Sequence, residues 1–359
     1  MVTNKINIVL FGIGNVGSTL IKQVIESQLF FLEKKNIRLC FPIIANSTLA
    51  FFEKEEKQNC WEVNFDKLAI PYTIQDIIKY TQENNLKNLI AVDATASKEF
   101  TKSYNLLIKN NFNIVAANKK ANTLSQDFYH QIRHKLKKYN KKFLYETNVG
   151  AGLPVINTIR DLHYSGENIT KIRGVFSGSL SYIFNTFAKE PVPFSYILQK
   201  AENLGYTEPD SREDLSGNDV ARKLLILARE VEQEFELSDV KVQSLLLPEL
   251  EEHISYIDYK KNTSLLDPYF EKTKKNQAEN HVLRYVGELD VKNKILEVKL
   301  NSEAIDSPMG QLKGTDSIIE IYSESYKNPI VIQGAGAGKE VTARGLLADI
   351  LRMSEYIGN

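Results

Sequence analysis

The sequence predicts an α/β fold in two domains, the first built on a parallel sheet and the second an α+β domain with a mixed sheet. Three observations predict this class. An apolar run over 6–11 leads directly into a glycine-rich turn and a helical pattern. Short apolar runs then alternate with helical patterns up to about residue 148, as in a parallel sheet with covering helices. Beyond that point, paired strand patterns over 283–300 and 318–333 indicate a different sheet.

The glycine-rich turn stands between the first predicted strand and the first predicted helix. Its first glycine permits a tight turn, its second lets a pyrophosphate approach the backbone, and its third lets the helix pack on the strand. The phosphates would rest on N–H groups at the start of the helix. The alternative is a plain structural turn. In this context the pattern predicts a Rossmann-type dinucleotide site at Gly12, Gly14, Asn15, Val16 and Gly17.

The ends of the next strands bear on the choice of cofactor. The second strand, over 38–45, is followed by Asn46, so it lacks the acid that usually binds the ribose 2′-hydroxyl of NAD. No arginine is obvious there either, so the sequence permits NADP and leaves NAD open. The third strand, over 89–94, ends in small residues, where an open α/β sheet accepts its ligand. Thr95 is a candidate there for the cofactor or, alternatively, for a helix N-cap.

The remaining periodic segments give the expected order of elements and domains. Helices are expected at 74–84, 100–110, 125–139 and 341–357, with a short one inside 51–67 and helical pieces over 245–270 that break at Pro248 and Pro268. Strands are expected at 113–117, 142–146, 172–176, 283–290, 294–300, 318–322 and 330–333. We expect a nucleotide-binding domain at 1–148, a substrate domain at 149–333, and a segment at 334–359 whose helix returns to line the cleft.

An acidic loop runs into a long predicted helix in the second domain. Glu208 and Asp214 stand in this loop beside proline and glycine, a composition typical of a shaped loop. Ser216 is expected to cap the helix, with Asp219 completing a capping box. Asp219 and Lys223 are four residues apart and share a helix face. Alone, they would be a solvated ion pair. With the acids nearby, the pattern favours a lysine poised as a proton donor.

Three further segments are candidates for polar ligands, each with a plainer alternative. Lys119 follows the strand at 113–117, where it is either near the nicotinamide or simply solvated. Glu146 begins a small-residue segment whose exposed carbonyls could bind a hard cation, or which is only a turn. Hydroxyl residues at 177–181 open a helix that suits a polar ligand. The glycine run at 334–338 opens the last helix and allows close approach of a ligand.

Composition excludes several classes of function. The chain has 359 residues with 45 basic and 45 acidic side chains, so it lacks the basic excess of a nucleic-acid-binding protein. Its apolar runs are too short to span a membrane. Cys40 and Cys60 form neither a disulfide framework nor a metal site. We therefore expect a soluble protein of the cytoplasm that binds neither nucleic acid nor membrane.

Several segments together carry a family resemblance over essentially the whole chain. The chain resembles homoserine dehydrogenase, and especially the dehydrogenase half of bifunctional aspartokinase–homoserine dehydrogenases. The resemblance implies an oxidoreductase acting on a CH–OH group, which reduces L-aspartate 4-semialdehyde reversibly to L-homoserine with NAD(P)H, on the route to threonine and methionine. The segments that resemble the family most specifically are residues 118–122, 146–154, 177–183 and 205–223.

The resemblance also implies roles for individual residues. It implies that Lys223 exchanges a proton with the substrate oxygen beside Asp219, and that Lys119 lies between cofactor and substrate. The implied substrate site comprises Gly205, Glu208, Asp214, Asp219 and Ser179. The implied cation site, of the sodium type, comprises Glu146 and the carbonyls of Val149, Ala151 and Leu153. Cofactor contacts would include Thr95, Lys119 and Gly338, and a homodimer would form through the second domain.

Two departures from the family pattern and two rival functions remain. Ala117 stands where many members have proline. The chain has no aspartokinase half, nor room after Gly338 for a regulatory domain, so threonine inhibition through such a domain is not expected; the chain could equally be a piece of a longer protein. An acylating semialdehyde dehydrogenase would need a cysteine nucleophile in the second domain. A dinucleotide sensor without activity would not need Lys119, Glu208, Asp219 and Lys223 together.

Overall fold

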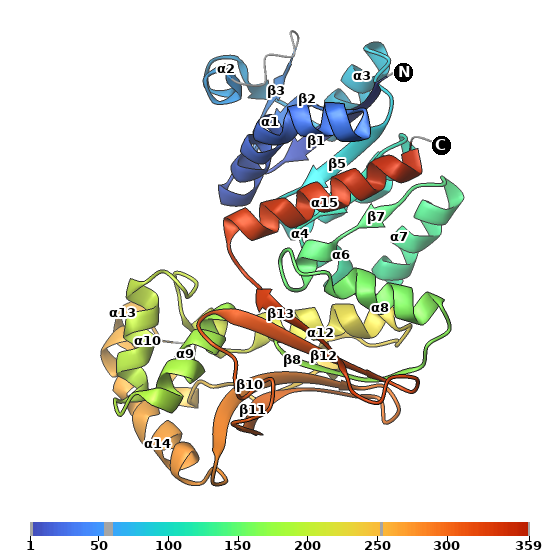
Figure 1. The fold of residues 1–359 in the computed structure, drawn as a ribbon. Helices are drawn as coiled ribbons and strands as arrows, with labels where there is room; N and C mark the ends of the chain where they lie inside the picture. Colours follow the sequence, from blue (N-terminus) through green and yellow to red (C-terminus); the bar gives the residue numbers. More distant parts are fainter. Residues whose placement is uncertain (1–2, 54–59, 252–253, 358–359) are drawn as a thin grey trace. The chain divides into compact units, whose positions relative to one another are not determined.

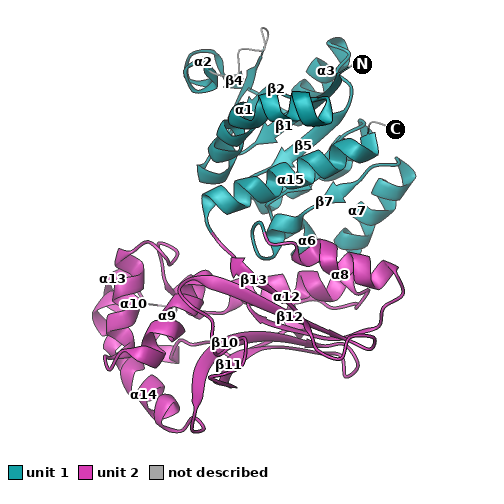
Figure 2. Cartoon of the chain, in the orientation of Figure 1, with its two compact units in different colours: residues 1–152, 338–359 teal, residues 153–337 magenta. Residues whose placement is uncertain are grey.

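The chain folds into two compact units in the computed structural model, which describes residues 3–53, 60–251 and 254–357. Unit 1 comprises residues 1–152 and 338–359, and unit 2 comprises residues 153–337 (Figure 2). The expected fold class is confirmed: unit 1 has the predicted α/β architecture and unit 2 has a mixed sheet. The domain limits expected at residues 148 and 333 stay a prediction.

Unit 1 is organised around a seven-stranded sheet in the order β4-β3-β2-β1-β5-β6-β7. The strands β2, β1, β5, β6 and β7 pair in parallel, whereas β3 and β4 add an antiparallel edge. Central strands are continuous apolar runs because helices cover both faces of such a sheet. The strands are β1 Asn4–Phe11, β2 Ile37–Ala45, β3 Leu49–Phe52, β4 Ile70–Pro71, β5 Leu89–Asp93, β6 Asn113–Ala116 and β7 Phe143–Leu144.

The helices of unit 1 follow the predicted order with one correction. The helix expected at 100–110 is two short helices, because Ser103 N donates to Phe100 O at 2.9 Å and tightens the chain between them. The strand β3 was missed, and part of the segment predicted over 51–67 lies outside the described residues. The helices are α1 Asn15–Lys35, α2 Trp61–Leu68, α3 Ile74–Glu83, α4 Lys98–Thr101, α5 Tyr104–Lys109, α6 Lys120–Thr123, α7 Gln126–Lys138, the 3₁₀ turn η2 Glu146–Asn148 and α15 Lys339–Ile357.

The C-terminal helix α15 packs beside α1, although the two are separated by most of the sequence (Figure 1). Leu346 and Ile350 of α15 share one buried core with Leu20 of α1 and the central strands. Gln23 Nε2 donates to Glu340 O at 2.9 Å across the same contact. The last helix is thus part of the unit that contains the glycine turn, where its apolar stripe is buried.

Unit 2 is built on a six-stranded mixed sheet in the order β13-β12-β8-β10-β11-β9. All its pairs are antiparallel except β11 with β9. The expected hairpin around 291–293 is present as β10 and β11. The strands are β8 Ile169–Val175, β9 Lys241–Val242, β10 His281–Asp290, β11 Ile295–Ala304, β12 Asp316–Ser323 and β13 Ile330–Ala335.

Neighbouring residues of β10 identify the two faces of this sheet. A Cβ on Gly287 would lie 3.2 Å from Val220 of helix α12 (Asn218–Glu230), so that face is covered closely by a helix. Val286 points to the opposite face, where it packs with Met309 and Leu312 from the connection between β11 and β12. The helical segments are α8 Val155–Tyr164, α9 Gly178–Lys189, α10 Phe194–Asn203, α11 Arg212–Leu215, α12 Asn218–Glu230, α13 Tyr256–Asn262, α14 Asp267–Lys275 and the 3₁₀ turns η3 Leu237–Asp239, η4 Pro248–Leu250 and η5 Thr263–Leu266.

Two local expectations in unit 2 are corrected. Ser216 does not cap α12: the N-cap is Gly217 at φ 73°, with no side-chain cap bond, and the Ser216 hydroxyl donates to Glu213 O. A residue in this left-handed conformation turns the chain between α11 and α12, and this conformation favours glycine. Pro248 and Pro268 do not break helices but lie in the first turns of η4 and α14, where a missing N–H costs nothing.

Candidate functional site

The glycine turn of unit 1 has three glycines with three different surroundings. Gly12 has φ 96°, and a Cβ there would lie 2.9 Å from the carbonyl of Ala94. A Cβ on Gly17 would lie 1.9 Å from Gly12 O, so helix α1 packs directly on the turn. Gly14 has nothing within 4 Å of its Cβ position, and it begins α1 without a side-chain cap. Open space in front of an uncapped helix N-terminus fits a phosphate group.

The turn after β2 contains no carboxylate. Asn46 occupies the position after Ala45, and its Oδ1 accepts hydrogen bonds from Thr48 N at 2.9 Å and Leu49 N at 2.7 Å. The Asn46 side chain therefore shapes the turn into β3. Tyr72 donates from its hydroxyl to Asn46 O at 3.0 Å and so lies against the same turn. Nothing in these contacts repels a ribose 2′-phosphate.

A buried carboxylate that no sequence pattern indicated, that of Asp93, joins the ends of β5 and β6. Asp93 accepts hydrogen bonds from Tyr104 Oη at 2.6 Å, from Asn118 Nδ2 at 2.9 Å and from Thr95 N at 2.8 Å. Burial raises the pKa of Asp93 even though these bonds lower it. Thr95 Oγ1 accepts from Ser97 N, and Ser97, not Thr95, caps α4. The suggested cap role of Thr95 is therefore wrong, and its cofactor contact stays a prediction.

Lys119 lies at the turn between β6 and α6, and its backbone is held on both sides. Its carbonyl accepts from Asn122 N at 3.1 Å and from Thr123 Oγ1 at 3.2 Å. The preceding Asn118 accepts at Oδ1 from Lys120 N at 3.0 Å. Lys119 itself is half-buried. The position is the carboxyl end of a parallel strand, where α/β sheets bind ligands, while its cofactor role stays a prediction.

The segment proposed for a cation contains a buried carboxylate and strongly bent backbone. Glu146 and Val149 are buried, and Ala151 has φ 52° after Gly150 at φ 77°. Glu146 N donates to Asp349 Oδ2 of α15 at 2.9 Å. The strand expected over 142–146 is only β7, because the 3₁₀ turn η2 begins at Glu146. Leu153 belongs to unit 2. A carboxylate with backbone carbonyls is the oxygen ligand set that hard cations prefer.

The closing glycine run joins β13 to α15. Gly338 has φ 117°, and its carbonyl accepts from Thr342 N at 3.0 Å and Thr342 Oγ1 at 2.8 Å in the first turn of the helix. Gly336 is pressed against Ser317, whose Oγ would lie 2.0 Å from a Cβ there. These glycines are required by local packing and turn geometry. The cofactor contact of Gly338 stays a prediction.

In unit 2, Lys223 is buried and its ammonium has two fixed partners. Nζ donates to Phe176 O at 2.7 Å, at the end of β8, and lies 2.9 Å from Asp219 Oδ2. The Lys223 side chain is 10% exposed, whereas that of Asp219 is 46% exposed. The pair is therefore not the solvated ion pair that Asp219 and Lys223 would form on an exposed helix face. A buried amine held by one carbonyl and one carboxylate keeps a defined direction.

Asp214 joins the acidic loop to the start of α9. Its Oδ1 accepts from Ser179 Oγ at 2.5 Å, and its Oδ2 accepts from Glu208 N at 2.8 Å. Ser179 Oγ is also 2.8 Å from Ser177 Oγ. Burial, helped by smaller contributions from the charges of Glu208 and Asp219, raises the pKa of Asp214 to about 6, although the two hydrogen bonds oppose the shift. The acids of the loop and of α12 thus lie within electrostatic reach of each other.

The outer part of the loop is held from both ends. Gly205, at φ 69°, ends α10 in the left-handed conformation common after a helix. Arg212 pairs with Asp210 at 2.6 Å and donates to Ile254 O at 2.9 Å, which anchors the loop to the following segment. Glu208 is exposed between these two anchors. The loop therefore presents a carboxylate from a fixed frame, and the substrate roles of Gly205 and Glu208 stay predictions.

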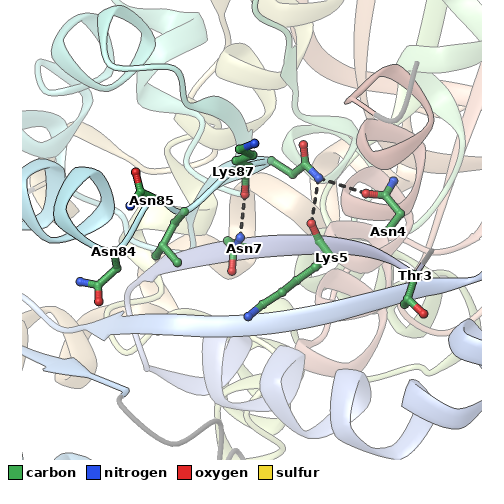
Figure 3. Close-up of a pocket in the computed structure, with 9 residues that line it drawn as sticks. Thr3, Asn4, Lys5, Asn7, Asn84, Asn85 and Lys87 are labelled. Atoms are coloured by element: carbon green, nitrogen blue, oxygen red, sulfur yellow. Dashed lines mark hydrogen bonds between the residues drawn. The ribbon is translucent and has the colours of Figure 1, made fainter.

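The structure provides no competing metal or membrane site in the part of the chain that it describes. Within residues 3–53, 60–251 and 254–357, no group of three or more His, Cys, Asp or Glu side chains could hold a metal, and no helix is long and apolar enough to cross a membrane. A cavity of about 560 Å³ lies at the amino ends of β1 and β5, where Asn7 Nδ2 donates to Lys87 O (Figure 3). Because α/β sheets bind ligands at the opposite edge, we assign it no role.

Comparison with known families matches both parts of the chain. The model of the family described as homoserine dehydrogenase matches residues 154–351, and the model described as homoserine dehydrogenase, NAD binding domain, matches residues 12–146.

Individual relatives agree with these family models. A bifunctional aspartokinase/homoserine dehydrogenase of Buchnera aphidicola is 39% identical over 97% of this chain and 42% of its own length. The chain thus spans about two-fifths of this relative. A homoserine dehydrogenase of Paracoccidioides brasiliensis is 40% identical over 75% of each chain.

Solved structures share the fold. A Candida auris protein, titled as of unknown function, is 34% identical with a TM-score of 0.90 over 98% of this chain and 99% of its own. A hyperthermophilic archaeal homoserine dehydrogenase in complex with NADPH has a TM-score of 0.75 at 20% identity, over 98% of each chain, which supports the fold alone.

Proposed function

The chain belongs to the homoserine dehydrogenase family, and from this premise we propose that it catalyses the reversible NAD(P)H-dependent reduction of L-aspartate 4-semialdehyde to L-homoserine. This is a step of threonine and methionine biosynthesis. The observation that carries the proposal is the buried ammonium of Lys223, held by Phe176 O at 2.7 Å and by Asp219 at 2.9 Å. Such an amine suits a reaction in which negative charge grows on an oxygen atom.

Each functional group of the proposed site has one role in this reaction. When bound, the nicotinamide cofactor supplies the hydride that reduces the aldehyde carbon. Lys223 then stabilises the developing alkoxide and donates a proton to it, which gives the alcohol; in the reverse direction the amine accepts that proton. Asp219 holds the amine, and Glu208 with Asp214 attracts the substrate ammonium. Ser179 supports Asp214 through their 2.5 Å hydrogen bond.

For the cofactor we propose NADP, with NAD as the second candidate. The turn shaped by Gly12 and Gly17 would hold the pyrophosphate at the open space beside Gly14, against the N–H groups of Asn15 and Val16. The absence of an acid at Asn46 supports room for a 2′-phosphate. Thr95, Lys119 and Gly338 would complete the nicotinamide side.

We also propose a monovalent cation such as sodium, a homodimer and a cytoplasmic location. Glu146 and the carbonyls of Val149, Ala151 and Leu153 would hold the cation, since their oxygen atoms match its chemistry. The dimer would form through unit 2. Analytical ultracentrifugation tests the dimer, and titration of sodium or potassium during cofactor binding tests the cation.

The test of the activity is an assay of the purified protein. We expect homoserine-dependent reduction of NADP that needs no phosphate. Reduction of NAD under the same conditions should be slower or absent. A requirement for phosphate would favour an acylating semialdehyde dehydrogenase. That rival needs a reactive cysteine, whereas Cys40 is buried in β2 and Cys60 precedes α2, both in unit 1. Cofactor binding without turnover of homoserine would favour a sensor protein and reject the proposal.

A further inference from the structure

Two fully buried asparagines connect the Lys119 turn to the segment that begins at Glu146. Asn122 Nδ2 donates to Asn148 Oδ1 at 2.9 Å, and Asn148 Nδ2 donates to Ala116 O at 2.9 Å. Both side chains are 0% exposed. The hydrogen bonds therefore run from α6, through η2, to the last residue of β6. The proposed mechanism gives neither asparagine a role.

The direction of this chain of hydrogen bonds is fixed by Arg133. Its Nη2 donates to Asn122 Oδ1 at 2.9 Å and to Tyr145 Oη at 2.5 Å, while its guanidinium lies 3.7 Å from the Tyr129 ring centre. A guanidinium can only donate, so the oxygen of Asn122 must face it and the amide nitrogen must face Asn148. Asn148 must then accept from Asn122 and donate to the backbone. Neither amide can rotate without losing two buried hydrogen bonds.

This chain of bonds ends at both sides of Lys119. Ala116 O, three residues before Lys119, also accepts from Thr147 Oγ1 at 3.2 Å. Asn122 N, three residues after Lys119, donates to the Lys119 carbonyl at 3.1 Å. A displacement of the segment 146–148 would therefore move the turn that carries the lysine.

We propose that Asn122 and Asn148 are positioning residues, which set the Lys119 turn against the Glu146 segment and act on the reaction through Lys119. The inference rests on the role given to Lys119 in the proposed function. It assigns the buried amide pair a task beyond packing, because the pair bonds the turn that carries Lys119 to the segment 146–148. It also predicts that substitutions in η2 alter the position of Lys119.

The test is Asn148→Asp, which places a carboxylate oxygen against Ala116 O with little change in size. We expect kcat to fall about 10- to 100-fold, as for outer groups that orient a functional residue. The NADPH dissociation constant should rise much less, because the glycine turn proposed to hold the pyrophosphate is untouched and only the Lys119 side of the cofactor is affected. Backbone amides of 116–124 should exchange hydrogen faster. Asn105→Asp is the matched control, since Asn105 Nδ2 donates to Gln131 Oε1 in an exposed amide pair of the same unit.

Coupling to Lys119 is measured with a double variant. If Asn148 acts through Lys119, then Lys119→Ala with Asn148→Asp should be as active as Lys119→Ala alone. A further loss of similar size in the double variant would overturn the coupling while leaving the proposed function intact. Unchanged turnover in Lys119→Ala alone would instead reject the role of Lys119 in the proposed function, and this inference with it. If Asn148→Asp does not fold, Asn122→Ala replaces it in the same cycle.

Discussion

The ammonium of Lys223 donates a hydrogen bond to the carbonyl of Phe176 over 2.7 Å, which connects helix α12 to the end of strand β8. The carboxylate of Asp219, one turn earlier on the same helix, lies 2.9 Å from the same amine. The carbonyl on one strand end and the carboxylate one helical turn away together give the buried amine a fixed direction.

Removal of this amine should abolish turnover and spare cofactor binding. For Lys223→Ala we expect kcat for homoserine oxidation to fall by about 10²- to 10⁴-fold, the usual contribution of a general acid or base. NADPH binding, followed by fluorescence titration, should not change. Lys200→Ala is the control, since Lys200 pairs with Glu190 at 3.1 Å on another helix of unit 2. Wild-type turnover in Lys223→Ala would reject the assigned role.

Substitutions of Gly14 and Gly17 at the start of α1 should have separate effects, the first on ligand binding and the second on folding stability. Gly14→Ala fits the backbone at φ −69° and meets no atom within 4 Å, so stability should change by less than about 0.5 kcal/mol. If a pyrophosphate occupies that space, the cofactor dissociation constant should rise at least about tenfold. A cofactor affinity unaffected by Gly14→Ala would exclude this position as the cradle.

Gly17→Ala is the matched comparison and should act on the fold itself. Its Cβ would lie 1.9 Å from Gly12 O, so the helix must shift. We expect the free energy of unfolding to fall by about 1–3 kcal/mol, as for other overpacked sites. Chemical denaturation measures it, and a stability equal to that of the wild type would show that α1 does not pack as described.

Asp214 should make the stability of the protein depend on pH in an unusual direction. Burial raises its pKa from 3.8 to about 6, so between these values the folded state binds the proton more tightly than the unfolded state. The free energy of unfolding should therefore fall as the pH rises through this window, by up to about 3 kcal/mol from this group.

Asp214→Asn should remove that dependence, because the amide does not titrate. The measurement is chemical denaturation of both proteins from about pH 4 to about pH 7, comparing the change in unfolding free energy. Above the window the ionised Asp214 should also favour the substrate ammonium, so the KM for homoserine should rise as the pH falls below about 6 in the wild type. Parallel pH profiles in the two proteins would contradict the assignment.

The turn between α11 and α12 should tolerate no side chain. Gly217 has φ 73°, and a Cβ would lie 2.0 Å from the Tyr285 hydroxyl. We expect Gly217→Ala to lower the unfolding free energy by about 2 kcal/mol or more, through backbone strain and overpacking together. Adding Tyr285→Phe should recover part of that loss. Equal stability of the double and single variants would mean that the hydroxyl contact does not matter.

Much of the fold follows from patterns of neighbouring residues. The apolar run of β1, the glycine turn and the helical spacing of α12 are each contained within a few residues, so the sequence predicts them. The short edge strands β3, β4 and β9 were missed because two to four residues are too few for a period to be recognised. The capping box at Ser216 was wrong because Tyr285, far along the chain, requires a bare glycine in the turn.

The candidate site, too, has parts that the sequence predicts and parts that only the structure shows. Local spacing alone placed Asp219 one helical turn from Lys223, and composition alone marked the acidic loop. The carbonyl of Phe176, the bond from Ser179 to Asp214, and the bond from Asn122 to Asn148 join residues that no sequence period relates. Asp93 was missed because its importance depends on β6 lying beside β5.

By itself, the sequence determined the architecture of both domains, the glycine turn between the first strand and the first helix, and the helix face that Lys223 shares with Asp219. Only the tertiary structure decided which distant backbone and side-chain groups those residues bond. The physical reason is that a helix or a turn is set by interactions over three or four residues, whereas the partner of a buried polar group is whichever donor or acceptor the packed core brings within hydrogen-bond distance.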